Sequence, residues 1–265
     1  MKLSAYIPKE KGGFLNELGN KYIPEQYKRL YEYASDINEL LYDLYQDKNM
    51  NICNEEKKYF FMLFGEMHKT YQSIIILSQR GLEEDALTLT RRLYEMLFKL
   101  VAIFNDKENI KQIKEDRLAE YNILQDKIEK NYPGMEILKN KGLNFRDGIE
   151  HKKISVYSWA KRAGMEDIYN CEYSILCSYS HASYDTINAG AYNEIDSIML
   201  LYIPCYNNYE MIVSEAICIM VKITEVLIKK LNLALIDEKH LNNIKEELEK
   251  IKKETKGEKN IRKEN

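Results

Sequence analysis

Residues 81–104 read GLEEDALTLTRRLYEMLFKLVAIF. Apolar side chains recur in this stretch every three or four residues, which is the spacing of one face of an α-helix. The set that we expect to face inward is Leu82, Ala86, Leu89, Leu93, Met96, Leu97, Leu100 and Val101. We therefore predict a helix from just after Gly81 to about Phe104.

A second helix precedes this one. Asn54 is a good capping residue, two glutamates follow it, and the pattern continues to about Arg80 before Gly81 ends it. The β-branched run Ser73–Leu77 lies inside this stretch, and the length of the stretch favours helix over strand there. Because the connection at Gly81 is very short, we expect the two helices to form an antiparallel hairpin.

Helical spacing extends over most of the remaining chain, and no alternation of strands and turns is found. The further helices that we predict span about Pro24–Gln46, Lys107–Asn131, Ser155–Ala163, Glu166–Ser180, Asn207–Leu231 and Asp237–Lys253. The sequence therefore predicts an all-α protein, more than about two-thirds helical and without a sheet, against a base rate of about one-third helix.

The ends of the chain differ in composition from this helical part. Residues 1–22 contain several glycines and predict an irregular N-terminal arm, whereas residues 255–265 predict a charged, flexible tail. We expect residues 23–254 between them to form a single helical domain, because 265 residues suit one large domain.

Composition excludes several classes of function. The net charge is −3, which argues against a broad basic coat for non-specific nucleic-acid binding. The first residues lack the apolar region of a secretory signal, and the most apolar stretches, Ser73–Leu77 and Ile195–Pro204, are too short to span a bilayer. We therefore expect a cytoplasmic protein without a membrane partner.

Cysteines and histidines give no metal-binding pattern. The five cysteines form no Cys-x-x-Cys pair, so we expect reduced, mostly buried thiols, no bound metal and no cofactor. The four histidines form no pair at i, i+4 and no Glu-x-x-His motif. His68 and His240 stand among charged helix positions, and we predict that both lie on the surface.

His181 has a different setting. It stands in the sequence YSHASYD, residues 179–185, where a predicted helix gives way to a less regular segment. Small hydroxyl residues beside it would let a substrate approach, and imidazole can accept and donate protons near neutral pH. The alternative is a structural histidine at a helix end, where its positive charge is favourable.

Two pairs with i, i+4 spacing combine an arginine with a possible partner. Arg91 and Glu95 lie on one face of an otherwise apolar helix, so we expect them to pair and to mark either a site or a wet helix face. Arg117 and Tyr121 form the second pair on the following helix. Trp159, the only tryptophan, is predicted to be buried and to anchor its short helix.

The stretch from Gly81 to Glu95, with Arg91-x-x-x-Glu95, resembles a helix of an uncharacterised bacterial family of unknown function. A second motif of that family resembles the run from Tyr173 to Ser183, with Ser178-x-x-His181-x-Ser183. Trp159 and Tyr169 also match the pattern, and the resemblance covers about Phe60–Leu231. The family is helical and is more remotely similar to the HEPN domains of prokaryotic defence systems and toxins, which implies a HEPN-like bundle with extra N- and C-terminal helices.

The HEPN resemblance implies metal-independent RNA cleavage, in which a histidine acts as acid or base and an arginine stabilises the phosphorane. HEPN ribonucleases carry Arg-x(4–6)-His, but Cys177, Leu176 and Ile175 stand four to six positions before His181. The sequence therefore departs from the HEPN motif, and our hypothesis is that Arg91 supplies the guanidinium from another helix.

Further roles follow from the same resemblance. Glu95 would orient Arg91, and Ser183 would donate a hydrogen bond beside His181. Arg117, Tyr121 and Tyr173 are the expected binding residues.

We accordingly expect a cytosolic bacterial effector that cleaves or binds RNA, in phage defence or in a toxin system. Two alternatives are a non-catalytic helical interaction module, with a second copy of the chain or another protein as partner, and a small-molecule sensor. The ribonuclease hypothesis requires Arg91, Glu95 and His181 to converge in space, within reach of one bridging water.

Overall fold

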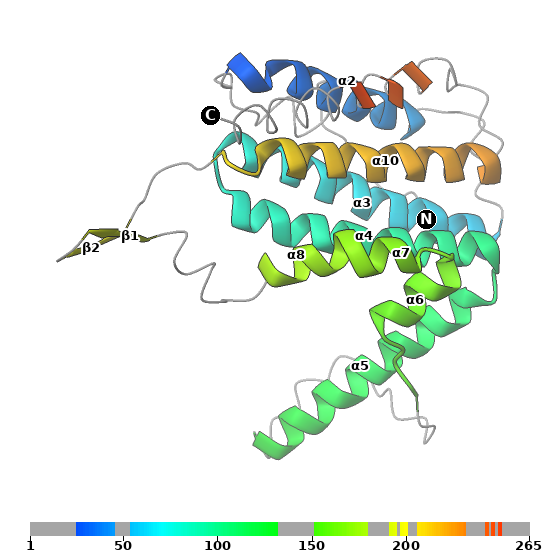
Figure 1. Ribbon diagram of the computed structural model, residues 1–265. Coiled ribbons are helices and arrows are strands. Elements are labelled where there is room, and N and C mark those ends of the chain that lie inside the picture. The colour runs from blue at the N-terminus through cyan, green and yellow to red at the C-terminus, as the bar shows by residue number, and fades with distance from the viewer. Residues whose placement is uncertain are drawn as a thin grey trace. The chain divides into compact units, whose positions relative to one another are not determined.

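The computed structural model describes residues 25–45, 54–131, 151–179, 191–194, 197–200 and 206–231, together with the pairs 242–243, 245–246 and 249–250. The protein is all-α (Figure 1). Its helices are η1 (Glu25–Tyr27), α2 (Lys28–Tyr45), α3 (Glu55–Gln79), α4 (Glu83–Asn105), α5 (Asn109–Asn131), α6 (Val156–Ala163), α7 (Glu166–Ile168), the π-helical turn η3 (Tyr169–Tyr173), α8 (Ser174–Tyr179) and α10 (Tyr209–Leu231).

One short antiparallel hairpin, β1 (Ala191–Glu194) with β2 (Ser197–Leu200), was not predicted. It falls between α8 and α10, where the sequence shows apolar residues without clear helical spacing. The predicted N-terminal arm and C-terminal tail lie outside the described residues, and so does most of the helix expected at 237–253.

Local signals set the ends of α3 as predicted. The Asn54 side chain accepts a hydrogen bond from the Lys57 amide at 2.8 Å. At the other end Gly81 has a φ of 70°, and the Leu82 amide donates to the Leu77 carbonyl at 3.0 Å. A left-handed residue of this kind closes a helix and is most easily a glycine. The chain then reverses direction, and α4 runs back along α3 (Figure 1).

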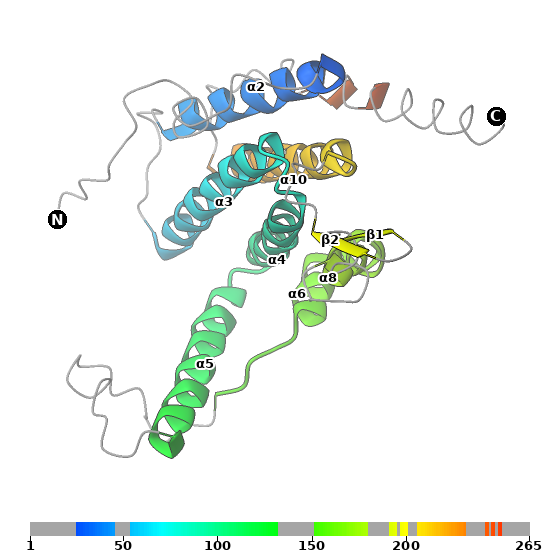
Figure 2. The same ribbon diagram turned by 90° about the vertical axis from the view of Figure 1, so that its left-hand side faces the viewer.

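Contacts divide the chain into two compact units. Unit 1 comprises residues 1–97 and 167–265, and unit 2 comprises residues 98–166, so α4 contributes to both. In unit 1, α10 packs against both α2 and α3 (Figures 1 and 2). Its buried side chains include Ile212, Val213, Ala216, Ile217, Met220 and Ile223. The Tyr71 hydroxyl donates to the Ala34 carbonyl at 2.7 Å and so joins α3 to α2 in the same core.

The start of α10 is held at the turn between α3 and α4. The buried carboxylate of Glu83 accepts hydrogen bonds from the Asn208 amide at 2.7 Å and from its side-chain nitrogen at 3.2 Å. The Tyr206 hydroxyl donates to the Gln79 carbonyl at 3.1 Å. A negative charge at the N-terminus of a helix satisfies its unpaired amides and interacts favourably with its dipole. Glu83 thus caps α10 through Asn208, which lies 125 positions later in the chain.

Most of the inward-facing set on α4 is buried as predicted, with two differences. Leu82 is 48% exposed because it belongs to the turn rather than to the helix, and Leu89 is only half-buried. The surface prediction for His68 is wrong. Its side chain is buried and stacks on the ring of Phe64, and Nε2 lies 2.9 Å from Asn38 Oδ1 and 3.2 Å from Gln72 Nε2. These polar partners make burial of an imidazole tolerable.

Unit 2 is built around Trp159. The indole is 1% exposed, and its Nε1 donates to Asp116 Oδ2 on α5 at 2.9 Å. Ser155 caps α6, accepting from the Ser158 amide at 3.1 Å, and Gly164 ends it with a φ of 68°. The predictions of a short capped helix and of a buried tryptophan are both confirmed. α6 is thus anchored to α5 through one aromatic side chain and one buried carboxylate.

Replacing Trp159 with alanine should lower the free energy of unfolding by about 3–5 kcal/mol, because the change empties a fully buried site and removes the donor to Asp116. Tyr157→Ala is the matched control on the same helix, since Tyr157 is 42% exposed and should cost within about 0.5 kcal/mol. Chemical denaturation followed by circular dichroism measures both, and equal costs would contradict the anchoring role.

His68 should make stability depend on pH. Burial lowers the pKa of His68 to about 3, from the ordinary value of 6.5. Below pH 6.5 the unfolded chain binds a proton that the buried ring does not, so the free energy of unfolding should fall as pH drops toward 3. The loss attributable to this residue is at most about 1.4 kcal/mol per pH unit. His68→Gln should flatten the profile between pH 6.5 and 5, and parallel wild-type and variant curves there would contradict the assignment.

Candidate functional site

Three of the predicted site residues form one cluster in unit 1. Arg91 Nη2 lies 3.2 Å from Glu95 Oε1, as the i, i+4 spacing on α4 predicts. The Tyr173 hydroxyl completes the cluster: it accepts from Arg91 Nε at 3.2 Å and donates to Glu95 Oε1 at 2.8 Å. The guanidinium carbon also lies 5.5 Å from the centre of the Tyr173 ring, within the range of a cation–π contact. One hydroxyl therefore bridges the two members of an ion pair.

The helix that carries Tyr173 is not a regular α-helix, although we predicted an uninterrupted one over Glu166–Ser180. Between α7 and α8 the chain makes the π-helical turn η3, which ends at Tyr173. Within it the rings of Tyr169 and Tyr173 stack with centres 5.0 Å apart, and the Ser174 hydroxyl donates to the Tyr169 carbonyl at 2.8 Å. Such turns within α-helices are frequently found at functional sites.

The cluster is shielded from water but not sealed. Tyr173 is buried, whereas the side chains of Arg91 and Glu95 are 28% and 29% exposed. Burial raises the pKa of Tyr173, and its hydrogen bond to Glu95 adds to the rise against the opposing effect of Arg91. Burial alone would lower the pKa of Arg91, but Tyr173 and Glu95 outweigh it and raise that pKa. Near neutral pH the cluster therefore holds a neutral phenol beside a permanently charged guanidinium.

A second polar contact, missed in the sequence, lies on the same helix. The Tyr94 hydroxyl donates to Glu215 Oε2 on α10. Burial raises the pKa of Tyr94, and the negative charge of Glu215 raises it further. Glu215 is an acidic residue within the apolar run Ile212–Met220, and that anomaly is the signal that could have identified it.

The remaining predicted site residues are placed less fully. His181 and Ser183 lie outside the described residues, so their convergence with Arg91 and Glu95 stays a prediction. Arg117 and Tyr121 belong to unit 2, where Arg117 Nη2 donates to the Tyr121 hydroxyl at 3.1 Å. This pair forms as its spacing predicts, and nothing in its geometry assigns it a ligand.

The described cysteines are free thiols, but the expectation that they are mostly buried is wrong for all three. Cys171 is exposed, and Cys177 and Cys218 are half-buried. Among the described residues no three His, Cys, Asp or Glu side chains gather as a metal site would require. No helix within the described ranges is long and apolar enough to cross a membrane.

Residues 57–197, more than half of the chain, match a family of unknown function named DUF5677. The chain belongs to this family. The matched region contains both sequence motifs, from Arg91-x-x-x-Glu95 to Ser178-x-x-His181-x-Ser183, and it confirms the resemblance to a helical family of unknown function. No curated protein and no solved structure matches the chain. Membership in DUF5677 brings no activity with it, so function must come from the site.

Tyr173→Phe tests the cluster as a physical unit. It removes the bridging hydroxyl and should cost about 1 kcal/mol of stability, since both charged partners are partly solvated. Tyr179→Phe, at a half-buried position on α8, is the control and should change stability by less than about 0.5 kcal/mol.

A double-mutant cycle extends this test. Glu95→Gln and Tyr173→Phe share one hydrogen bond, so their combined cost should be smaller than the sum of the single costs. Additive costs, measured by chemical denaturation, would show that the contact carries no coupling.

Proposed function

We propose that this protein cleaves or binds RNA at the Arg91–Glu95–Tyr173 cluster, as a HEPN-like cytosolic effector of the kind found in phage defence or toxin systems. The observation that carries the proposal is the fixed, partly exposed guanidinium of Arg91, held by a phenol and a carboxylate from two helices. The helix that supplies Tyr173 ends at Tyr179, two positions before His181.

Arg91 is suited to stabilise a phosphorane because its orientation is set in advance. Charge that develops in a transition state is stabilised best by groups that need not reorganise. The contacts from Tyr173 and Glu95 restrict the guanidinium on two sides. The Arg91 side chain is still 28% exposed to solvent, so a ligand can reach it. Glu95 has a positioning role in this proposal, and its negative charge moderates the attraction of Arg91 for phosphate.

His181 supplies the acid–base chemistry in the proposal. Its imidazole accepts the proton of the ribose 2′-hydroxyl, and the 2′-oxygen bonds to phosphorus while the bond to the 5′-oxygen breaks. The proton passes to the leaving 5′-oxygen, so the products are a 2′,3′-cyclic phosphate and a 5′-hydroxyl end. Ser183 donates a hydrogen bond beside the histidine. None of these steps needs a metal ion.

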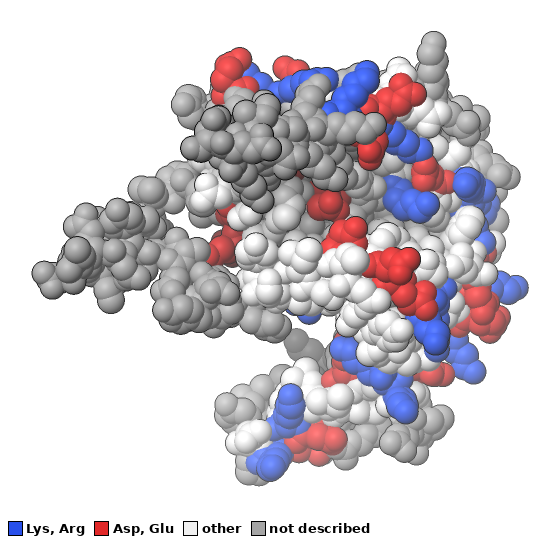
Figure 3. All heavy atoms as spheres, viewed as in Figure 1, with Lys and Arg blue, Asp and Glu red and all other residues white. Residues whose placement is uncertain are grey.

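The distribution of surface charge indicates that the protein contacts few RNA phosphates at once. On the face drawn in Figure 3, acidic and basic side chains are interspersed, and the surface over α8 is largely uncharged. Affinity that depends on one or two phosphates falls only weakly with salt, with a slope of about −1 in log K against log salt for a single strand. A steep slope would indicate a basic surface other than this cluster.

The test uses the full chain and a labelled single-stranded RNA in the presence of a chelator. We expect cleavage that leaves 2′,3′-cyclic phosphate ends, lost in His181→Ala and reduced at least about tenfold in Arg91→Gln, because one charge-assisted contact to the transition state is worth more than about 1.4 kcal/mol. Circular dichroism establishes that each variant is folded.

Two neighbouring substitutions serve as controls. Arg92→Gln removes the adjacent, exposed arginine, and His151→Ala removes a histidine of unit 2; both should leave cleavage unchanged. If the wild type neither cleaves nor binds RNA, or if Arg91→Gln and Arg92→Gln behave alike, the proposal fails. The cluster is then a structural network, and the interaction module or the small-molecule sensor becomes the leading function.

A further inference from the structure

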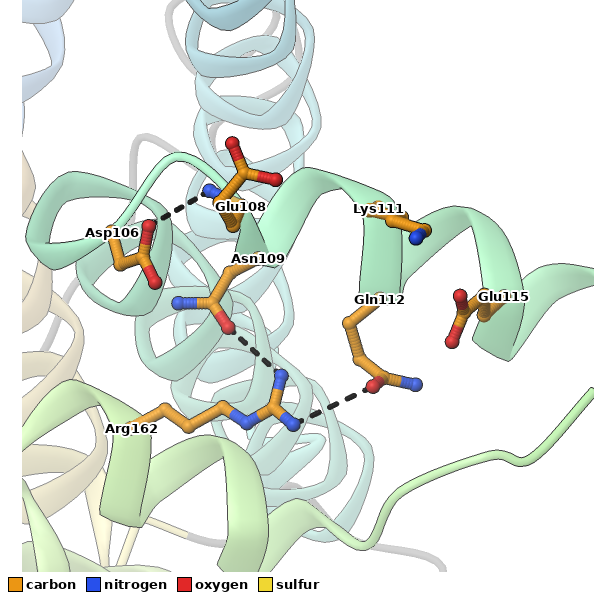
Figure 4. Close-up of a pocket in the computed structure, with 7 residues that line it drawn as sticks. All are labelled: Asp106, Glu108, Asn109, Lys111, Gln112, Glu115 and Arg162. Carbon is orange, nitrogen blue, oxygen red and sulfur yellow. Dashed lines mark hydrogen bonds between the residues drawn. The ribbon is translucent and has the colours of Figure 1, made fainter.

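Unit 2 carries a polar hollow of about 440 Å³ that is separate from the Arg91 cluster (Figure 4). Its wall consists of the first turns of α5, Asp106 and Glu108 just before them, and Arg162 from the end of α6. All of the residues that line it are polar or charged. The hollow lies wholly within residues 98–166, so its shape depends on this unit alone.

Arg162 is held in the hollow by neutral groups. Its Nη1 donates to Asn109 Oδ1 at 2.8 Å, and its Nη2 donates to Gln112 Oε1 at 3.4 Å. The guanidinium carbon also lies 5.5 Å from the centre of the Trp159 ring. Figure 4 shows Arg162 reaching from α6 to these two amides on α5.

Both amides are themselves fixed. The side-chain nitrogen of Asn109, Nδ2, donates to the Ala102 carbonyl at 2.8 Å. The side-chain oxygen of Asn109 therefore faces Arg162. The side-chain nitrogen of Gln112, Nε2, donates to Asp116 Oδ1 at 3.0 Å and to the Lys152 carbonyl at 3.1 Å. Arg162 is thus oriented before any ligand arrives, which reduces the ordering cost of binding.

The charges around the hollow are not compensated by one another. No ion pair joins Arg162 or Lys111 to any carboxylate of the described residues, although Asp106, Glu108 and Glu115 line the same hollow. The amides turn their oxygens to Arg162 in place of a carboxylate. A hollow that presents a prepared cation and nearby carboxylates is complementary to a molecule that carries both signs of charge.

We propose that this hollow binds a small zwitterion, whose phosphate or carboxylate pairs with Arg162 and whose ammonium group faces Glu115. The proposal does not depend on RNA cleavage, since Arg91, Glu95 and Tyr173 belong to the other unit. It gives the chain a ligand site of its own in unit 2, with Arg162 as the residue that recognises the anion.

Trp159 provides the readout, because it is the only tryptophan and lies against Arg162. The full chain is titrated with O-phosphoethanolamine and with β-alanine, which share an ammonium group and differ in the anion. Inorganic phosphate is titrated as the anionic group alone, and ethylamine as the ammonium group alone. Tryptophan fluorescence and calorimetry are recorded together, so that binding without a change in emission is also detected.

We expect saturable binding of at least one zwitterion, tighter than either half alone by up to about fivefold, because a second, partly exposed ion pair contributes at most about that factor. Comparing O-phosphoethanolamine with β-alanine shows whether the site prefers a phosphate or a carboxylate. Arg162→Gln should weaken binding at least about tenfold and Arg162→Lys should weaken it less, since lysine keeps the charge but not the fork. Glu115→Gln should abolish the preference for the zwitterion.

Lys161→Gln is the matched control, because Lys161 is the neighbouring basic residue of α6, is exposed and does not line the hollow. It should bind like the wild type. Circular dichroism and chemical denaturation show whether the Arg162→Gln variant is folded, with α6 still packed against α5. The proposal is overturned if no probe binds the wild type, if inorganic phosphate binds as tightly as either zwitterion, or if Lys161→Gln weakens binding as much as folded Arg162→Lys.

Discussion

The carboxylate of Glu83 sets the register of unit 1. It stands at the turn between α3 and α4 and accepts hydrogen bonds from the amide and side chain of Asn208, so α10 must begin at that corner. Once the start of α10 is fixed, its regular rise determines which of its residues lie beside α3 and α4. The contact between Tyr94 and Glu215 depends on this placement. An acidic residue that looks like an ordinary first-turn glutamate of α4 therefore organises a helix far along the chain.

Two polar side chains of unit 1, His68 and Arg91, differ in burial and in charge. His68 is buried with Asn38 and Gln72 around it, and the imidazole stays neutral because a charge there would lose its hydration. Arg91 keeps its charge, and its partners Glu95 and Tyr173 leave it in partial contact with water. The first arrangement can only stabilise the core. The second leaves a charged group oriented and accessible, which is the requirement for recognising an anion.

Local signals predicted the parts of this structure that depend on local physics. Asn54, Gly81, Ser155 and Gly164 mark helix ends because capping and left-handed backbone involve only neighbouring residues. The Arg91–Glu95 pair is likewise a consequence of helical spacing. The family resemblance singled out Tyr173, but its contact with a residue 82 positions earlier depends on helix packing that no local pattern encodes. The error for His68 has the same origin, since its burial depends on Asn38 of another helix.

The π-helical turn η3 lets this stretch of helix hold one residue more than a regular α-helix would. Its hydrogen bonds close over five residues instead of four, so the extra residue is taken up within the turn and the helix faces before and after it stay aligned. Removing a single residue from 169–172 would therefore return the turn to regular α-helix and leave Tyr173 on the side that meets Arg91. In evolution this segment could thus gain or lose one codon while the bridging phenol of the cluster kept its place.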